Sequence, residues 1–115
     1  MSASSLGITL VVFLAMLATA LAFSGDATYF NVGLGACGHH NNNNQLVAAL
    51  NKPQYGGGGD CGKRAHIKGP KGEVTVTIVD ECPGCAYGSL DLSPAAFSHI
   101  AELRQGRVHI EWQWA

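Results

Sequence analysis

Asp91 is the residue of this sequence that is best placed for acid–base chemistry. It lies between Leu90 and Leu92, two residues before Ser93, which with Pro94 is expected to begin a helix. If both leucines point inward, they partly desolvate the carboxyl, and desolvation raises a carboxyl pKa toward the range that a general acid needs. The simpler interpretation is that Asp91 bonds loop or helix amides. The residues by themselves leave both interpretations open.

The segment Cys82–Cys85, with the sequence Cys-Pro-Gly-Cys, is the second chemically distinctive feature. Such a pair can be a redox dithiol, half of a zinc site or a local disulfide. A redox pair should open a helix, whereas Pro-Gly favours a turn. A zinc site needs two more ligands, from among Cys37, Cys61, His39 or His40, but the spacing matches no known zinc finger. We therefore expect no metal, and two disulfides among the four cysteines, with three possible pairings.

Asp80 and several aromatic residues are further candidates. Asp80 is expected to end the strongest strand, where the simplest role for its side chain is to bond a turn. Aromatic side chains near Gly-rich loops can stack on sugar rings or belong to the core; those considered are Tyr29, Phe30, Tyr55 and Tyr87. Trp112 and Trp114 share the apolar face of the last expected strand, so we assign them to the core.

The elements that must position these residues are mostly strands. Alternating apolar and polar residues predict strands over 26–30, 63–67, 74–79 and 107–114. The segment Gln45–Leu50 suits a short helix that ends at Asn51, before Pro53. Another helix is predicted from Pro94, with Ser93 as its N-cap, up to Gly106. Several short strands with Gly-rich turns and one or two short helices indicate a small closed β-barrel.

The first part of the chain is apolar and uncharged. No Lys, Arg, Asp or Glu precedes Asp26, and a small-x-small sequence at 20–22 resembles a signal-peptidase site. Because no basic cluster follows, we expect residues 1–22 to be a cleaved signal peptide and residues 23–115 to form one secreted domain. The net charge of −1 shows no excess of positive charge that would indicate binding to nucleic acid or to an anionic membrane.

Taken in chain order, six short motifs resemble one protein family. They are Gly25–Phe30 (GDATYF), Gly35–Gly38 (GACG), Cys61–Lys63 (CGK), Thr77–Cys85 (TIVDECPGC), Leu90–Ser93 (LDLS) and Phe97. The set resembles the secreted fungal expansin-like proteins called loosenins, within the RlpA-like double-psi β-barrel superfamily. This resemblance implies an all-β fold, namely a small six-stranded double-psi β-barrel with one or two short helices, and no cofactor.

The resemblance also implies roles for individual residues, because the family is similar to the first domain of plant expansins and to family 45 glycoside hydrolases. Asp91 matches the general acid of those hydrolases and the Asp that expansins need for wall loosening. Substrate binding is assigned to Thr28, Tyr29, Phe30, Asp80 and Tyr87. Phe30 stands where expansins have Tyr, so a hydroxyl is lost there, and Asp80 is expected to organise the psi loop.

A second carboxylate, which an inverting hydrolase needs as a base about 6.5–9.5 Å from the acid, is not expected at the matching place. In the hydrolases that base closely follows the first strand, where this sequence has Asn31 and Val32. Asp26 is the only carboxylate nearby and comes too early to match. The sequence therefore predicts no ordinary inverting glycosidase.

By the same resemblance, Cys37 pairs with Cys61 and Cys82 with Cys85. The expected function is that of a secreted, monomeric, expansin-like protein that binds and loosens cellulose or another cell-wall glucan without ordinary hydrolysis. Because the chain stops at Ala115, without the second domain of full expansins, we expect the barrel groove alone to bind the polymer. One alternative is a protease inhibitor or effector that docks through loops 39–44 and 55–59. Another is a lytic transglycosylase-like enzyme that uses Asp91 alone.

Overall fold

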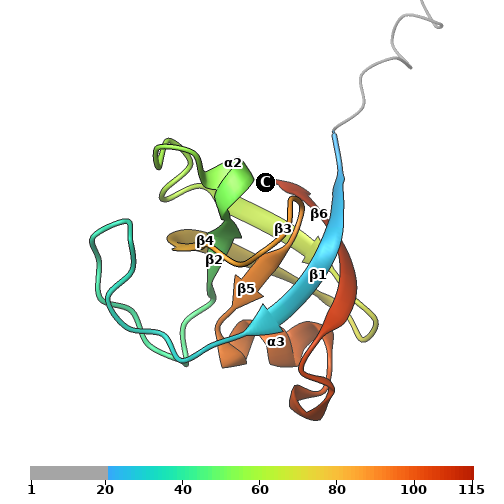
Figure 1. The fold of residues 1–115 in the computed structure, drawn as a ribbon. Helices are drawn as coiled ribbons and strands as arrows, with labels where there is room; N and C mark the ends of the chain where they lie inside the picture. Colours follow the sequence, from blue (N-terminus) through green and yellow to red (C-terminus); the bar gives the residue numbers. More distant parts are fainter. Residues whose placement is uncertain (1–20) are drawn as a thin grey trace, which may run out of the picture.

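The computed structural model describes residues 21–115, so the predicted signal peptide lies outside the described residues apart from its last two positions. Six strands make up most of the domain (Figure 1). They are β1 (Phe23–Tyr29), β2 (Val47–Asn51), β3 (Arg64–Lys68), β4 (Glu73–Cys82), β5 (Leu90–Leu92) and β6 (Val108–Trp114). The helical segments are α2 (Lys52–Tyr55), α3 (Pro94–Ile100) and the 3-10 turn η1 (Leu103–Gln105).

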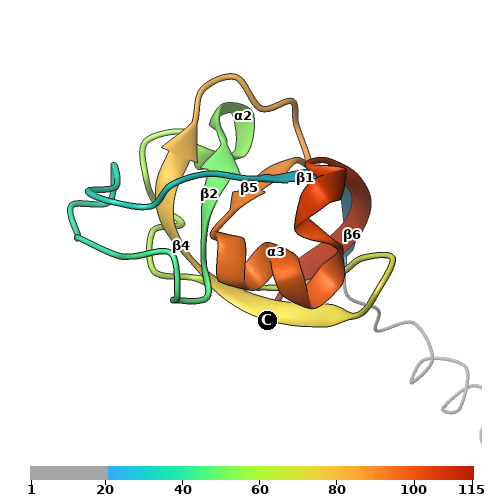
Figure 2. The ribbon, with the colours of Figure 1, turned by 90° about the horizontal axis from the view of Figure 1, so that it is seen from below.

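The strands close into a barrel in the order β1-β5-β2-β4-β3-β6. Two neighbouring pairs, β1 with β5 and β2 with β4, are parallel, and the other four pairs are antiparallel. Helix α3 covers one open end of the barrel (Figure 2). The prediction of a small, all-β, six-stranded double-psi barrel with two short helices is confirmed.

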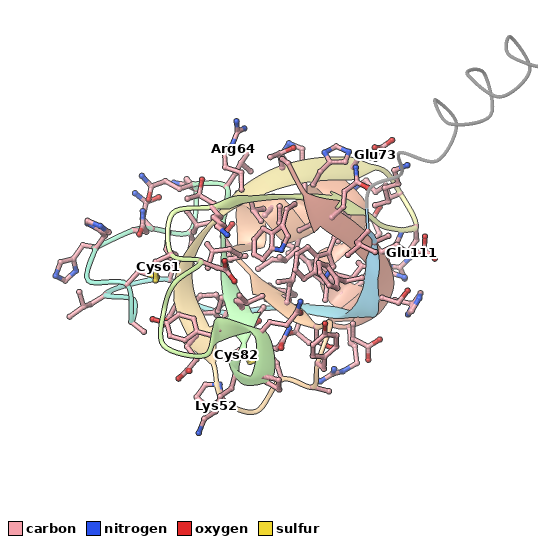
Figure 3. The ribbon with its side chains drawn as sticks, turned by 90° about the horizontal axis from the view of Figure 1, so that it is seen from above. Lys52, Cys61, Arg64, Glu73, Cys82 and Glu111 are labelled. Carbon is pink, nitrogen blue, oxygen red and sulfur yellow. A yellow bond between two sulfur atoms is a disulfide. The ribbon has the colours of Figure 1, made fainter. Side chains whose placement is uncertain are left out.

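The barrel core comes from strands that alternate between an apolar and a polar face. In β6, Val108, Ile110 and Trp112 are buried, whereas His109 and Glu111 between them are exposed. Side chains fill the barrel interior, and charged groups lie around the outside (Figure 3). The largest fully buried apolar side chains are Trp112, Phe97, Leu50, Ile67, Ile78, Leu90, Leu92, Ile100 and Ile110. The apolar face expected for the last strand is therefore part of the core.

The helix predicted over Gln45–Leu50 is wrong, because residues 47–51 form strand β2. All five residues of β2 are buried, and the strand lies between β4 and β5. A strand buried on both faces is a continuous apolar run, which periodicity cannot distinguish from a buried helix. Asn51 and Pro53 mark the start of helix α2 instead of the end of a helix, with Asn51 as the N-cap.

Helix α3 begins as predicted but is shorter than expected. The Ser93 hydroxyl accepts a hydrogen bond from the amide of Ala96 (3.1 Å), as an N-cap should. The helix ends at Ile100, and Ala101 is already extended. The amide of Lys71, in the turn between β3 and β4, donates to the carbonyl of Ile100 (2.9 Å). A tertiary contact therefore holds the helix end, and Gly106 terminates only the separate turn η1.

Two disulfides join Cys37 to Cys61 and Cys82 to Cys85, which agrees with the pairing expected from the resemblance. The first connects the long segment between β1 and β2 to the Gly-rich segment after α2. The second closes the turn that follows β4. Among residues 21–115 no cysteine is free, because all four belong to these two bridges.

Asn51 is the centre of a polar network that joins β2, α2 and the residue before β5, so a substitution at this position tests the network. This fully buried side chain accepts from the amide of Gln54 (3.0 Å) and donates to the carbonyl of Ser89 (3.0 Å). We expect Asn51→Ala to lower the free energy of unfolding by about 2–3 kcal/mol, because it removes a cap and leaves a buried carbonyl unpaired. Urea denaturation measures this loss, and the exposed Asn44→Ala serves as the control. Equal stability of the two variants would contradict the role of Asn51.

The Cys37–Cys61 disulfide closes a loop with a sequence separation of 24 residues. In the chain-entropy description, closing such a loop stabilises the folded state by about 3 kcal/mol. The double variant Cys37→Ser/Cys61→Ser should lose about that free energy of unfolding in urea. Cys82→Ser/Cys85→Ser, whose loop spans only 3 residues, should lose less, so the reverse order would contradict this account.

Candidate functional site

A row of four residues crosses four neighbouring strands on the outer face of the barrel. Thr28 of β1 is paired with Asp91 of β5, and Asp91 is paired with Ala49 of β2. Ala49 is also paired with Asp80 of β4. Directly paired residues point to the same face of a sheet, so Thr28, Asp91 and Asp80 share one surface. The small side chain of Ala49 separates the two carboxylates.

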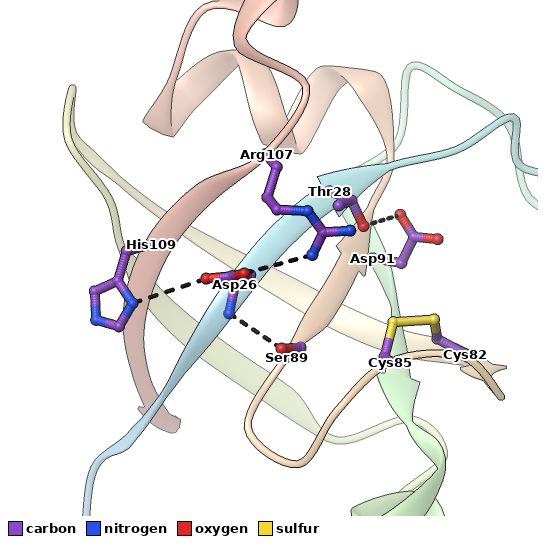
Figure 4. Close-up of polar contacts among 8 residues, drawn as sticks. All are labelled: Asp26, Thr28, Cys82, Cys85, Ser89, Asp91, Arg107 and His109. Carbon is purple, nitrogen blue, oxygen red and sulfur yellow. Dashed lines mark hydrogen bonds and ion pairs between the residues drawn. A yellow bond between two sulfur atoms is a disulfide. The ribbon is translucent and has the colours of Figure 1, made fainter.

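Asp91 points outward because its neighbours in β5 point inward. Leu90 and Leu92 are both fully buried in the core, and side chains alternate along a strand. The hydroxyl of Thr28 donates a hydrogen bond to Oδ1 of Asp91 (2.8 Å; Figure 4). The inward-pointing leucines expected from the sequence are therefore observed, and the carboxylate is half-buried on the outside.

The pKa of Asp91 is raised above the ordinary value of an Asp side chain. Burial is the largest cause, because desolvation penalises the charged carboxylate. The hydrogen bond from Thr28 and the positive charge of Arg107 lower the pKa and offset part of this effect, whereas the negative charge of Asp80 raises it further. Asp91 therefore keeps its proton to a higher pH than a solvated Asp does.

Asp91 lines an open groove of about 350 Å³. The groove lies between the outer faces of β1 and β5 and the turn that follows β4 (Figure 4). It is lined by Asp26, Thr28, Cys82, Gly84, Cys85, Ala86, Ser89, Asp91 and Arg107. Carboxylates, hydroxyls and a guanidinium all face it, so the groove can both donate hydrogen bonds to a polyol and accept them from it.

The turn that forms one wall of this groove is held closely against β1. A side chain at Gly25 would overlap the carbonyl of Gly88, and one at Gly88 would overlap the carbonyl of Ser24. Gly88 also has a φ of 85°, in the left-handed region that favours glycine. The indole of Trp112 donates to the Gly88 carbonyl (2.9 Å), and the Cys82–Cys85 bridge closes the same turn. The wall is thus fixed at both of its ends.

Asp26, Ser89 and Arg107 belong to the groove although they were not among the predicted site residues. The amide of Asp26 donates to the hydroxyl of Ser89 (3.1 Å), and Nη1 of Arg107 lies 3.4 Å from Oδ2 of Asp26. Alternation along β1 could have indicated Asp26, because it is two residues from Thr28 and shares its face. Arg107 could not have been identified in this way, because it reaches the groove only through the pairing of β1 with β6.

Asp80 holds a loop instead of lying at the end of a strand. Strand β4 continues to Cys82, so the predicted end at Asp80 is wrong. Oδ1 of Asp80 accepts hydrogen bonds from the amides of Ala36 (2.8 Å) and Glu81 (2.8 Å). Asp80 therefore fixes the segment between β1 and β2 against the barrel, and its charge acts on Asp91 from two strands away.

None of the three aromatic residues predicted to bind substrate lines the groove. Tyr29 follows Thr28 and points to the other face of β1, where its ring lies 4.9 Å from that of Phe97 and its hydroxyl donates to the Leu103 carbonyl (3.0 Å). Phe30 comes after β1 and is half-buried. Tyr87 lies in the wall turn, is 61% exposed and contacts Phe23. Their part in substrate binding stays a prediction.

The described part of the chain offers neither a metal cluster nor a membrane-spanning helix. Within residues 21–115, no group of three or more His, Cys, Asp or Glu side chains is arranged to hold a metal ion. No helix in that range is long and apolar enough to cross a bilayer.

Fold and site together define a double-psi β-barrel domain with one carboxyl of raised pKa in an open groove. A family model described as lytic transglycolase matches residues 22–112, and the chain belongs to this RlpA-like family of expansin-like proteins. The chain is 37% identical over 71 residues to Expansin-YoaJ of Bacillus subtilis, covering 58% of this chain and 31% of that protein. It is 30% identical to an EG45-like domain containing protein of Citrus jambhiri, covering 84% of each chain.

Two solved structures have a similar fold. The Clavibacter michiganensis expansin, determined as a point mutant in complex with cellohexaose, aligns with a TM-score of 0.77 at 29% identity, over 83% of this chain and 50% of that one. The Streptomyces papain inhibitor aligns with a TM-score of 0.73 at 29% identity, over 83% of this chain and 94% of that one. The chain thus spans half or less of the two expansins.

The raised pKa of Asp91 predicts how stability depends on pH. Between the ordinary pKa of Asp, about 3.9, and the raised value, the folded state binds more protons than the unfolded state, so stability falls as pH rises. Asn at this position does not titrate and can still accept from Thr28. We therefore expect Asp91→Asn to gain stability relative to the wild type as pH rises through this window.

Urea denaturation of both proteins at several pH values between about 3 and 7 measures this difference. The control is Glu111→Gln, which removes an exposed carboxylate from β6. A stability difference between Asp91→Asn and the wild type that stays constant with pH would contradict the raised pKa.

Proposed function

We propose that this chain is a secreted, monomeric, expansin-like protein that binds cellulose or another cell-wall glucan in the Asp91 groove and loosens it without ordinary hydrolysis. The observation that carries the proposal is the open groove in which Thr28 donates to a carboxyl of raised pKa. The Clavibacter expansin supports it, because that protein was determined in complex with cellohexaose.

The contacts of Asp91 support a role in breaking glucan–glucan hydrogen bonds. Thr28 occupies Oδ1, which leaves Oδ2 to face the groove. A protonated Asp91 can donate through this oxygen to a hydroxyl or a glycosidic oxygen of the polymer, and an ionised Asp91 can accept from a hydroxyl. Both interactions compete with the hydrogen bonds that hold neighbouring glucan chains together.

The other carboxylates on this face support the absence of ordinary hydrolysis. An inverting base must accept a proton from water. Asp26 lies within β1, where Arg107 makes a 3.4 Å contact with it, and Asp80 accepts two backbone amides at one oxygen. Neither residue lies in the segment directly after β1, which is where the hydrolases of the similar family have their base. Asp91 would thus act without a partner base.

Secretion is supported by three features of the chain. An apolar leader precedes the domain, both disulfides require an oxidising compartment, and the fold begins at Phe23, directly after the proposed signal peptide of residues 1–22. The net charge of −1 suits a neutral polymer better than a nucleic acid or an anionic membrane.

The test compares the purified wild type with Asp91→Ala on cellulose and on isolated wall material. Three quantities are measured together: the bound fraction, the mechanical strength of the material and the release of reducing sugar. We expect the wild type to bind and weaken the material without sugar release, and Asp91→Ala to lose the weakening. Asp60→Ala, which removes a carboxylate paired with Lys63 outside the groove, is the matched control.

Each contrary result contradicts a separate part of the proposal. Release of reducing sugar by the wild type would contradict non-hydrolytic action. Weakening that persists in Asp91→Ala would contradict the role of Asp91. Failure of the wild type to bind or weaken any glucan would contradict the function itself.

Inhibition of a cysteine protease is the second candidate function. The Streptomyces papain inhibitor aligns over 94% of its own length, with a TM-score of 0.73. In that case loops 39–44 and 55–59 would contact the protease, and Asp91 would have only a structural part. Inhibition of papain at nanomolar concentration, unchanged in Asp91→Ala, would favour this function over glucan binding.

A lytic transglycosylase-like activity is favoured by the description of the matching family model. Such an enzyme needs only one acid, and Asp91 is available for that role. Incubation with peptidoglycan, followed by mass spectrometry, would then give anhydro-sugar products that Asp91→Ala does not form. Their absence with the wild type excludes this activity.

A further inference from the structure

Asp26 and Arg107 form a second polar cluster in the same groove, next to Thr28 and Asp91. Both residues line the groove, and their side chains lie 3.4 Å apart at Nη1 and Oδ2 (Figure 4). The side chain of Arg107 is 66% exposed and that of Asp26 is 44% exposed. Part of each group therefore remains accessible to a ligand.

The distance between the two clusters follows from strand geometry. Asp26 precedes Thr28 by two residues on the same face of β1, which separates their Cα atoms by about 7 Å. Thr28 is in register with Asp91 across to β5, and Asp26 is in register with His109 across to β6. This separation is comparable to the length of one pyranose unit, so a polymer along β1 would present successive sugars to the two clusters.

The chemistry of the pair matches a neutral sugar. A guanidinium has five N–H donors and no acceptor, whereas a carboxylate only accepts. Arg107 makes one long contact with Asp26 and keeps other donors free. A donor and an acceptor side by side can bind two adjacent hydroxyls of one pyranose, because one hydroxyl accepts from Arg107 while its neighbour donates to Asp26.

We propose that Asp26 and Arg107 form a second sugar subsite that binds the vicinal hydroxyls of a neutral pyranose unit, one unit away from the sugar at Thr28 and Asp91. The proposal rests on the proposed glucan-binding function and deepens it. The paired charges set the specificity, because an anionic sugar is repelled by Asp26 and a cationic sugar by Arg107.

The test measures the affinity of the wild type, Asp26→Ala and Arg107→Ala for three oligosaccharides by calorimetry. The probes are cellohexaose, an oligogalacturonate and a glucosamine oligomer, which are neutral, anionic and cationic. We expect the wild type to prefer cellohexaose, and each variant to lose about tenfold in affinity for it, as for one charge-assisted hydrogen bond.

The specificity of the two variants should change in opposite directions. Asp26→Ala leaves Arg107 unpaired and should bind the anionic probe more tightly than the wild type does. Arg107→Ala leaves Asp26 with only the more distant His109, whose Nδ1 lies 3.9 Å from Oδ1, and should bind the cationic probe more tightly. A merely structural role would not produce this opposite change, because loss of the fold lowers every affinity together.

Two controls keep folding and function separate. Arg104→Ala removes an exposed arginine of η1 that does not line the groove, and it should leave all three affinities unchanged. Thermal unfolding shows whether each variant is folded. Asp26→Ala should remain folded, because the hydrogen bond from the backbone amide of residue 26 to Ser89 does not depend on the Asp26 side chain.

The failure of the subsite and the failure of the function give different results. If Asp91→Ala weakens cellohexaose binding while Asp26→Ala and Arg107→Ala do not, the function stands and the subsite is wrong. If both variants lose affinity for cellohexaose without the opposite change in charge preference, the specificity argument is wrong. If the wild type binds no neutral oligosaccharide, the proposed function is overturned, and the subsite with it.

Discussion

The parallel pairing of β1 with β5 is the constraint on which the rest of the site depends. This pairing joins residues 63 positions apart in the sequence and sets Thr28 opposite Asp91. A shift of one residue would send Asp91 into the core and Leu90 or Leu92 into water. The two leucines, fully buried, therefore fix the register, and the register fixes the hydrogen bond between Thr28 and Asp91.

The same packing raises the pKa of Asp91 and limits the stability of the fold. Burial disfavours the ionised carboxylate, and Thr28 and Arg107 compensate for only part of that effect. Asp80 adds a second negative charge across Ala49, held in place by two backbone amides. The domain thus keeps two carboxylates on one surface, where a less costly arrangement would have separated them, and this is typical of a functional site.

Much of the architecture could be predicted from the sequence, since it depends on local patterns. The alternation in Val108–Trp114 indicated the buried face of β6, and Ser93 with Pro94 marked the start of α3. The helix predicted over Gln45–Leu50 is wrong, because residues 47–51 form β2, and a strand covered on both faces has no alternation to reveal it. Leu90 and Leu92, at alternate positions on either side of Asp91, indicated that its carboxyl is partly desolvated.

The sequence by itself determined that Asp91 would be flanked by inward-pointing leucines, that the cysteines would be oxidised and that short strands would form a barrel. Only the tertiary structure decided which residues share the groove with Asp91. Arg107 lines the groove because β1 pairs with β6. Tyr29 does not line it, because its side chain points to the other face of β1, against Phe97. The physical reason is that a groove on a barrel is made by neighbouring strands, and strand neighbours here are far apart in the chain.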